Sequence, residues 1–230
     1  MQVIILFGPP GAGKGLQASL LSNKLTLYHL EASKIIEANI KDKKPEAFIK
    51  IKDKKYFLAK EKKLWVTGKL CTPIVVSYWV KNKIKEIAKL KKGVLLEGTP
   101  RSLGEAKEII SLLKKLYNPK NIKILFLEII PEETLYRNSH RRICQLMRHS
   151  ILYSVETKNL KFCPLDGSKL LRREGLDDPE TIKNRIKEYQ KRTLPLLKYF
   201  EKQGLKVKKI DGSLPPVLVF ESILDHLKND

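Results

Sequence analysis

Short apolar runs alternate with stretches of helical periodicity along most of the chain. Apolar runs at 3–7, 93–97 and 122–130, a short segment at 26–30 and an alternating segment at 206–210 predict five strands. The run at 122–130 is continuous enough to be covered on both faces. Helical patterns fill the intervals between them. This alternation predicts a doubly wound α/β fold, in which five parallel strands carry helices on both faces. In such sheets the ligand binds at the carboxyl ends of the strands.

The first helices are predicted from an apolar face and a capping residue. The segment 16–25 has helical spacing, and its apolar face is expected to consist of Leu16, Leu20, Leu21 and Leu25. Ser33 is the expected N-cap of a helix over 34–40. The lysine-rich stretch 41–63, broken by Pro45, predicts short helices on a peripheral lobe.

Two later helices begin at prolines, Pro73 and Pro131, and the second is expected to pass through Arg137 and Arg141. Periodicity is then lost over 143–172, which predicts a small inserted module. The remaining helices are expected over 104–117, 177–200 and 216–227.

A glycine-rich turn joins the first strand to the first helix. It consists of Gly8, Pro9, Pro10, Gly11, Ala12, Gly13, Lys14 and Gly15. Strand, glycine-rich turn and helix are the context that a phosphate loop requires, because glycines let backbone N–H groups close around a polyphosphate at the positive end of the helix. Lys14 is placed to reach the outer phosphates. The turn therefore predicts a nucleotide-binding site.

Charge changes this picture little. The 230 residues carry a formal net charge of +21, mostly from lysine, and the hydrophobic fraction of 42% is ordinary for a globular protein. A basic surface can attract nucleic acid, anionic membranes or small polyanions. Because the lysines are dispersed along predicted helices with few aromatic residues between them, we expect no dedicated nucleic-acid site.

The cysteines and the apolar runs indicate a cellular compartment. Cys71, Cys144 and Cys163 are too few for a disulfide framework, which indicates a reducing environment. No apolar run reaches the 18 residues of a membrane span, and the chain begins with a core strand instead of a signal peptide. We therefore expect a cytoplasmic protein.

Four motifs in sequence order resemble those of the adenylate kinase family. They are the phosphate loop at 8–15, Glu-Gly-Thr-Pro-Arg at 97–101, Arg-x-x-x-Arg-Arg at 137–142, and Asp-Asp-Pro-Glu-Thr-Ile-Lys-Asn-Arg at 177–185. The resemblance covers nearly the whole chain. It implies a P-loop core at 1–32, 71–141 and 175–230, a helical monophosphate-binding lobe at 33–70, and a small lid inserted at 142–174.

The resemblance implies phosphoryl transfer from magnesium-bound ATP to AMP, giving two ADP, by a monomer. Charge stabilisation and a lid that excludes water would promote this reaction. The implied catalytic cations are Lys14, Arg101, Arg137, Arg141, Arg173 and Arg185. The implied ATP-binding residues are the loop residues Gly8 to Gly15 with Leu16, Arg137, Arg141 and Gly212. The implied monophosphate-binding residues are Ala32, Glu37, Lys69, Cys71, Gly98, Arg101, Glu105, Arg173 and Arg185.

The acceptor side departs from the family pattern. The family reads Ser-Thr-Gly-Asp-x-x-Arg where this chain has residues 31–37, so that Ala32 replaces a threonine and Glu37 replaces the arginine that grips the monophosphate. A carboxylate at this place would repel the substrate phosphate. Lys34 could compensate, as a point charge on a flexible stem. Glu105 replaces a glutamine that reads adenine, and a carboxylate lacks the amide donors.

Two departures concern the magnesium ion. Leu16 stands where the family has a threonine near the magnesium shell, and Glu97 replaces an aspartate but can still orient metal-bound water.

A zinc ion is possible in the lid. Zinc-bearing relatives have two Cys-x-x-Cys or Cys-x-x-Asp pairs, and here Cys163 and Asp166 fit the second pair while Cys144 lacks its partner. His149 could complete the set of four ligands that zinc requires. We expect no ligand-like neighbours for His29, His140 and His226. The alternative, which we favour at this point, is a metal-free lid packed by Met147, Leu152, Phe162 and Leu165.

Other functions stay open. The departures at the acceptor side fit a catalytically weak relative that binds ATP as a sensor or scaffold, or a kinase for another nucleoside monophosphate. The charge leaves a third possibility, a basic ATPase associated with nucleic acid.

Overall fold

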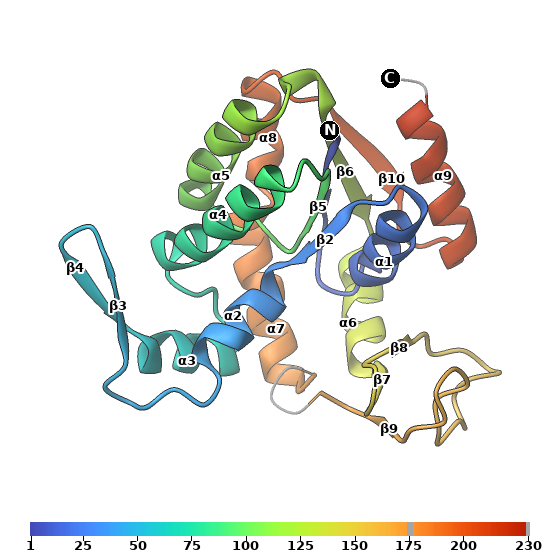
Figure 1. Cartoon of the computed structure of the whole chain (residues 1–230). Helices are drawn as coiled ribbons and strands as arrows, with labels where there is room; N and C mark the ends of the chain where they lie inside the picture. The colour runs from blue at the N-terminus through green and yellow to red at the C-terminus, as the bar shows by residue number, and fades with distance from the viewer. Residues whose placement is uncertain (174–176, 229–230) are drawn as a thin grey trace.

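The computed structural model describes residues 1–173 and 177–228, and its centre is a parallel sheet of five strands (Figure 1). In spatial order the strands are β10 (Val207–Asp211), β6 (Ile122–Glu128), β1 (Val3–Phe7), β5 (Val94–Glu97) and β2 (Tyr28–Glu31). All four neighbouring pairs are parallel. The predicted fold class is confirmed.

The helices and the smaller strands connect and surround this sheet. Among the described residues the helices are α1 (Lys14–Lys24), α2 (Ala32–Ile40), α3 (Leu58–Val66), α4 (Pro73–Lys89), α5 (Leu103–Leu116), the 3-10 helix η1 (Pro119–Asn121), α6 (Pro131–Ser139), α7 (Pro179–Glu188), the π-helix η2 (Tyr189–Thr193), α8 (Leu196–Lys202) and α9 (Pro216–Lys228). No helix in the described part of the chain is long and apolar enough to cross a membrane.

Both faces of the sheet are covered by helices. Alternate residues of β1 enter two separate cores, as the pleat of a strand requires. Val3 and Ile5 pack in one core with residues of α2, α4, α5 and α8. Ile4 and Leu6 pack in the other with residues of α1 and α9. The glycine-rich loop follows the carboxyl end of β1, and the turn at 98–102 follows the carboxyl end of β5.

The predicted apolar face of α1 is wrong at two positions. Leu16 and Leu20 are 39% and 37% exposed, whereas Gln17, Ala18 and Leu21 are buried. The helix is rotated because it packs between β5 and α9, and the Gln17 amide donates a hydrogen bond to the Pro216 carbonyl at 2.8 Å. The hydrogen bond of the Gln17 side chain therefore determines which face of α1 is buried.

The peripheral lobe also differs from the prediction. An antiparallel hairpin of β3 (Phe48–Ile51) and β4 (Lys54–Phe57) replaces the expected short helices before α3. Lys50, Lys54 and Lys55 are exposed in these strands, whereas Ile49 and Tyr56 pack against the core. Ser33 is not the N-cap of α2, because the helix begins at Ala32 and the Ser33 hydroxyl bonds to the Glu31 carboxylate.

The inserted module between α6 and α7 forms a small sheet. Its strands are β7 (Arg142–Cys144), β8 (Ser150–Ile151) and β9 (Leu170–Leu171), with β7 in the centre. Helix α6 ends at Ser139, so the prediction that it passes through Arg141 is wrong. The division into core, lobe and lid stays a prediction, and its limit at 174/175 lies outside the described residues. We call residues 142–173 the lid and residues 33–70 the acceptor lobe below.

Candidate active site

The glycine-rich loop follows β1 and leads into α1 as predicted. Gly8, Gly11 and Gly13 have positive φ angles of 147°, 88° and 79°, a backbone conformation that favours glycine. A Cβ atom at Gly8 would stand 2.4 Å from the Leu127 carbonyl oxygen. The Lys14 ammonium donates hydrogen bonds to the carbonyls of Gly8 and Pro9, at 2.9 and 2.6 Å. The lysine thus lies across its own loop.

Positive charges from distant parts of the chain gather around this lysine. Burial, and then the charge of Arg101, lowers the pKa of Lys14 to about 7, and Arg185 and Arg141 act in the same direction. Burial, and then the charges of Arg173 and Arg141, lowers the pKa of Arg185 to about 9. Burial and the charge of Arg173 lower the pKa of Arg141 to about 10. Half-buried cations that disfavour one another's charge form a site for a highly charged anion.

Arg101 is held in place by the turn that follows β5. The Glu105 carboxylate, buried at 2% exposure, accepts hydrogen bonds from the Arg101 backbone N–H at 3.0 Å and from the hydroxyls of Ser102 and Thr99 at 3.1 and 3.3 Å. Burial raises the pKa of Glu105. This carboxylate therefore fixes the turn that presents Arg101.

Arg173 and Arg137 are each held by more than one bond. Arg173 binds Asp177 through two nitrogens, at 2.6 and 3.2 Å, which ties the end of the lid to the segment before α7. Arg137 pairs with Glu133 at 2.5 Å and donates to the carbonyls of Gly212 and Ser213 at 2.8 and 3.0 Å. Arg137 is thus fastened to the turn after β10.

Gly212 brings that turn against the phosphate loop. A Cβ atom at Gly212 would lie 3.5 Å from the Ala12 carbonyl oxygen and 3.2 Å from the Glu128 carbonyl oxygen. The predicted ATP-binding residues at both ends of the chain are therefore neighbours.

Glu97 lies at the carboxyl end of β5, beside the start of α1. A Cβ atom at Gly15 would be 3.2 Å from its Oε1 atom, and its Oε2 atom is 2.8 Å from Nε2 of His29. Ligand atoms of His29, Glu31 and Glu97 lie within 4.8 Å of one another. The expectation that His29 has no ligand-like neighbours is wrong, because β2 and β5 are adjacent in the sheet.

Several residues predicted for the acceptor line one small cavity. Lys69, Cys71, Gly98, Arg101 and Glu105 surround a space of about 20 Å³ between α3, α4 and the turn after β5. Burial raises the pKa of Cys71 to about 12, so its thiol stays protonated at neutral pH.

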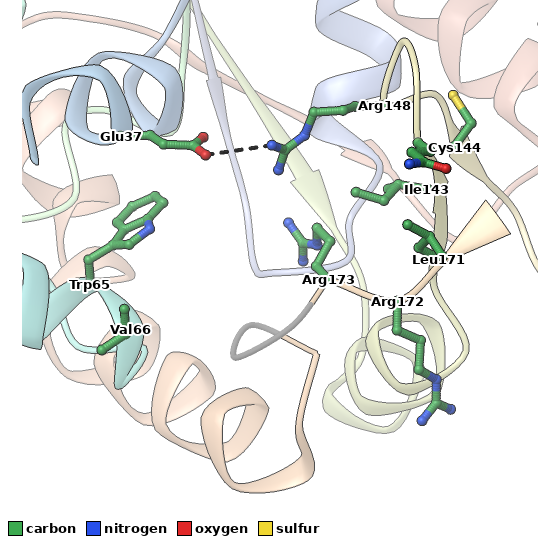
Figure 2. A pocket seen from close by; sticks show the side chains of 10 residues that line it. Glu37, Trp65, Val66, Ile143, Cys144, Arg148, Leu171, Arg172 and Arg173 are labelled. Carbon is green, nitrogen blue, oxygen red and sulfur yellow. Dashed lines mark ion pairs between the residues drawn. The ribbon is translucent and has the colours of Figure 1, made fainter. Parts of the chain in front are cut away.

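Ala32 and Glu37, which were also predicted to bind the acceptor, do not line this cavity. Lys34, which was expected to compensate for Glu37, does not line it either. Ala32 is buried at 1% exposure at the start of α2. Lys34 pairs with Glu31 at 2.9 Å, and its side chain is 70% exposed. The Glu37 carboxylate pairs instead with Arg148 of the lid, at 3.6 Å (Figure 2). The cation that pairs with Glu37 is therefore Arg148, and not Lys34 as expected from the sequence.

A larger cavity of about 330 Å³ separates the acceptor lobe from the lid. Figure 2 shows Glu37 and Trp65 on one side, and Arg148, Ile143 and Leu171 on the other. Arg173 lines it as well. Sequence reasoning missed Trp65 and Arg148, because no periodicity or motif marks either of them.

Four potential metal ligands meet in the lid. Cys144, His149, Cys163 and Asp166 place one donor atom each within 4.8 Å of the others. The two sulfurs lie 3.5 and 3.6 Å from Nδ1 of His149, and Oδ2 of Asp166 is 2.9 Å from Sγ of Cys144 and 3.2 Å from the same nitrogen. Hydrogen bonds from Cys144 and Ser168 lower the pKa of Asp166.

The apolar side chains that were expected to pack a metal-free lid are exposed. Their exposed fractions are high, namely 64% for Met147, 48% for Leu152, 55% for Phe162 and 74% for Leu165. The two cysteines are buried instead. The polar cluster is therefore the centre of the lid.

Comparisons with known proteins agree with this geometry. The family model described as adenylate kinase matches residues 6–205. The chain is 33% identical over 225 residues to an adenylate kinase of Methanosarcina barkeri, with 98% of each chain covered. It is 32% identical to adenylate kinases of Staphylococcus epidermidis and Staphylococcus aureus, with 97% of this chain and 98% of each relative covered.

Proposed function

Because this chain belongs to the adenylate kinase family and is a phosphotransferase of that type, we propose that ATP is its phosphoryl donor and AMP its acceptor. The γ-phosphoryl group would pass from ATP to AMP and leave two ADP molecules. One observation carries the proposal, namely the gathering of cations from five separate segments around the phosphate loop.

The donor is assigned to the loop. Backbone N–H groups of Gly11 to Gly15 and the ammonium of Lys14 would hold the β- and γ-phosphates, since a glycine-rich loop at a helix N-terminus binds such anions. The bonds from Lys14 to its own loop would then be exchanged for bonds to phosphate oxygens. Arg137 and Gly212 would flank the base of ATP, because the arginine already fastens that turn.

The arginines are proposed to bind the phosphoryl group that is transferred and the phosphate that accepts it. Arg141, Arg173 and Arg185 would neutralise charge on the moving phosphoryl, and Arg101 would hold the phosphate of the acceptor. Phosphoryl transfer depends mainly on positioning and on such charge stabilisation. Planar guanidinium groups suit the task because they bind phosphate oxygens in pairs.

Magnesium would arrive as part of the ATP substrate. Glu97 suits its hydrated ion, because a carboxylate at the end of a strand beside the phosphate loop can accept hydrogen bonds from metal-bound water. Leu16, with no hydroxyl, cannot contribute a ligand.

The acceptor is proposed to be AMP on the strength of the matched relatives, and the protein to act as a cytoplasmic monomer. Coupled detection of ADP tests this, with AMP, CMP, UMP and GMP offered in turn to the enzyme with magnesium and ATP. We expect turnover with AMP on the order of 1–100 per second. A protein that binds ATP but transfers to none of the four would contradict the proposal and support the sensor or scaffold alternative.

A structural zinc ion in the lid is a second part of the proposal. Ligand atoms of a tetrahedral zinc site lie roughly 3.5 Å apart, and most of the distances among Cys144, His149, Cys163 and Asp166 come close to that spacing. Two thiolates, an imidazole and a carboxylate form a complete donor set. These residues would hold the ion, which would cross-link the strands of the lid.

Metal analysis of the purified protein tests the zinc site. We expect one zinc per chain in the wild type and in Cys71→Ser, whose thiol lies in a different part of the fold, and none in Cys163→Ser. Zinc content that Cys163→Ser leaves unchanged would refute the assignment.

A further inference from the structure

We propose that Glu37 and Arg148 form a positioning pair that joins the acceptor lobe to the lid and thereby couples acceptor binding to donor binding. The proposal rests on the proposed function. It identifies Arg148 as a residue of the acceptor side, although its position in the sequence lies within the lid. It also gives Glu37 a role other than contact with the acceptor.

The pair spans the cavity between the two parts. Nη1 of Arg148 lies 3.6 Å from Oε1 of Glu37, and Figure 2 shows the two side chains reaching toward each other across the cavity. Glu37 belongs to α2, and Arg148 lies between β7 and β8. A cavity of about 330 Å³ is large enough for a small ligand. The ion pair is therefore an interlobe contact at a space that a ligand can enter.

The turn that carries Arg148 is unusually well fixed for an exposed lid loop. Arg148 has a positive φ of 58°, and its N–H donates to the Cys144 carbonyl at 3.1 Å. The next residue, His149, donates its backbone N–H to Sγ of Cys144 at 3.1 Å and contributes a side chain to the four-ligand cluster. Arg148 is thus presented toward the acceptor lobe by the same residues that hold the centre of the lid.

The charges lining the cavity fit an anion once Glu37 is neutralised. Glu37 is the one carboxylate among the described residues that line it, and Arg148 and Arg173 face it from the lid side. Arg172 also lines the cavity, but its guanidinium bonds to the Ser139 carbonyl and points away. An unpaired carboxylate here would repel a phosphate, whereas pairing with Arg148 removes that repulsion. Arg173, whose partner Asp177 does not line the cavity, is then the cation that faces a ligand there.

Coupling follows from the position of the pair. A donor nucleotide that draws the lid toward the core carries Arg148 with it, so that Glu37 is neutralised most completely when the donor is bound. Binding free energies are reciprocal, and the acceptor must then favour donor binding to the same degree. The side chains of Arg148 and Glu37 are 54% and 40% exposed, so we expect an effect of only a few fold.

Trp65 provides the assay. It lines the same cavity and is half-buried, whereas Trp79 is buried in the core at 7% exposure and serves as a constant background. Quenching or enhancement of Trp65 fluorescence gives the AMP dissociation constant, measured with and without a non-transferable ATP analogue. Glu37→Gln, Arg148→Gln and the charge-exchanged variant Glu37→Arg with Arg148→Glu are compared with the wild type. Lys83→Gln breaks an exposed ion pair on α4 and is the matched control.

In the wild type and in Lys83→Gln we expect the analogue to tighten AMP binding about three- to five-fold. Both single variants should lose at least half of this factor, and the charge-exchanged variant should regain it, while the melting temperatures stay within one or two degrees of the wild type. Undiminished coupling in Arg148→Gln, or no recovery in the charge-exchanged variant, overturns the pair. If the wild type turns over AMP while the coupling fails, only the pair is wrong. If the wild type neither binds nor phosphorylates AMP, the proposed function and the pair both fail.

Discussion

Replacing Lys14 by methionine should abolish activity and yet stabilise the nucleotide-free protein. In the folded state Lys14 is half-buried among arginines, and burial together with the charge of Arg101 lowers its pKa from 10.5 to about 7. The unfolded chain holds the lysine charged without this penalty. Methionine has a similar length and no charge, so the penalty disappears with the substitution.

The expected gain can be worked out from the pKa. A shift of this size corresponds to about 4 kcal/mol of destabilisation at pH 7, where the folded-state amine is half protonated. Against it stand the two hydrogen bonds to the carbonyls of Gly8 and Pro9, worth about 1 kcal/mol each. The net stabilisation is about 2 kcal/mol, which for a chain of this length raises the melting temperature by about 6 °C.

Differential scanning calorimetry without nucleotide measures this, and Lys24→Met on the exposed end of α1 is the matched control. The gain should also depend on pH in a defined direction. Because the folded pKa of Lys14 lies below the unfolded one, the unfolded state binds more protons between pH 7 and about 10.5, and wild-type stability rises with pH over that window. The difference between wild type and Lys14→Met should therefore shrink as the pH rises. A variant that melts lower than the wild type at pH 7, or a difference that does not shrink, would refute the reasoning.

Three further substitutions test other parts of the structure. Glu61→Ala removes a buried carboxylate that accepts the backbone N–H at the start of α4 at 2.7 Å, and should lower the free energy of unfolding by about 2–3 kcal/mol in a denaturant titration. Arg137→Ala releases the turn after β10 and should raise the KM for ATP several fold, with the KM for AMP unchanged in steady-state kinetics. Gly8→Ala places a Cβ atom 2.4 Å from a carbonyl oxygen of β6 and should destabilise by about 3 kcal/mol or more, whereas Gly13→Ala, with open space around it, should cost about 1 kcal/mol by denaturant titration.

The sheet and the phosphate loop were predictable because their signals are local and dense. The strands β1, β5 and β6 are runs of mostly apolar residues, and the loop combines glycines with a lysine between a strand and a helix. The hairpin over 48–57 escaped prediction because Phe48 and Phe57 are exposed together with Lys50, Lys54 and Lys55, so no regular alternation marks the strands. A lysine-rich segment without such alternation is equally typical of a solvated helix. Ile49 and Tyr56 can be recognised as the inward-facing residues of the hairpin only when the core against which they pack is known.

The candidate site contains contacts that sequence spacing cannot supply. His29 meets Glu97 because β2 and β5 are neighbours in the sheet, although 68 positions separate the two residues in the chain. His149 joins two cysteines in the lid through a turn that fits no regular ligand spacing. Arg148 meets Glu37 across a cavity between two segments, neither of which carries a signal for the other.

The proposed donor and acceptor halves of the site differ in what supports them, and most departures from the family pattern fall on the acceptor side. The phosphate loop is fixed between β1 and α1 and against Leu127 and Gly212, so a substitution there has no other element that could replace the lost contact. The acceptor lobe faces the lid across the larger cavity, and we propose that a cation lost from the lobe is supplied from the lid. The structure brings Arg148 to Glu37 in this way. We therefore expect that the charges at positions 37 and 148 must be changed together to preserve the acceptor site, and that changing either one alone weakens it.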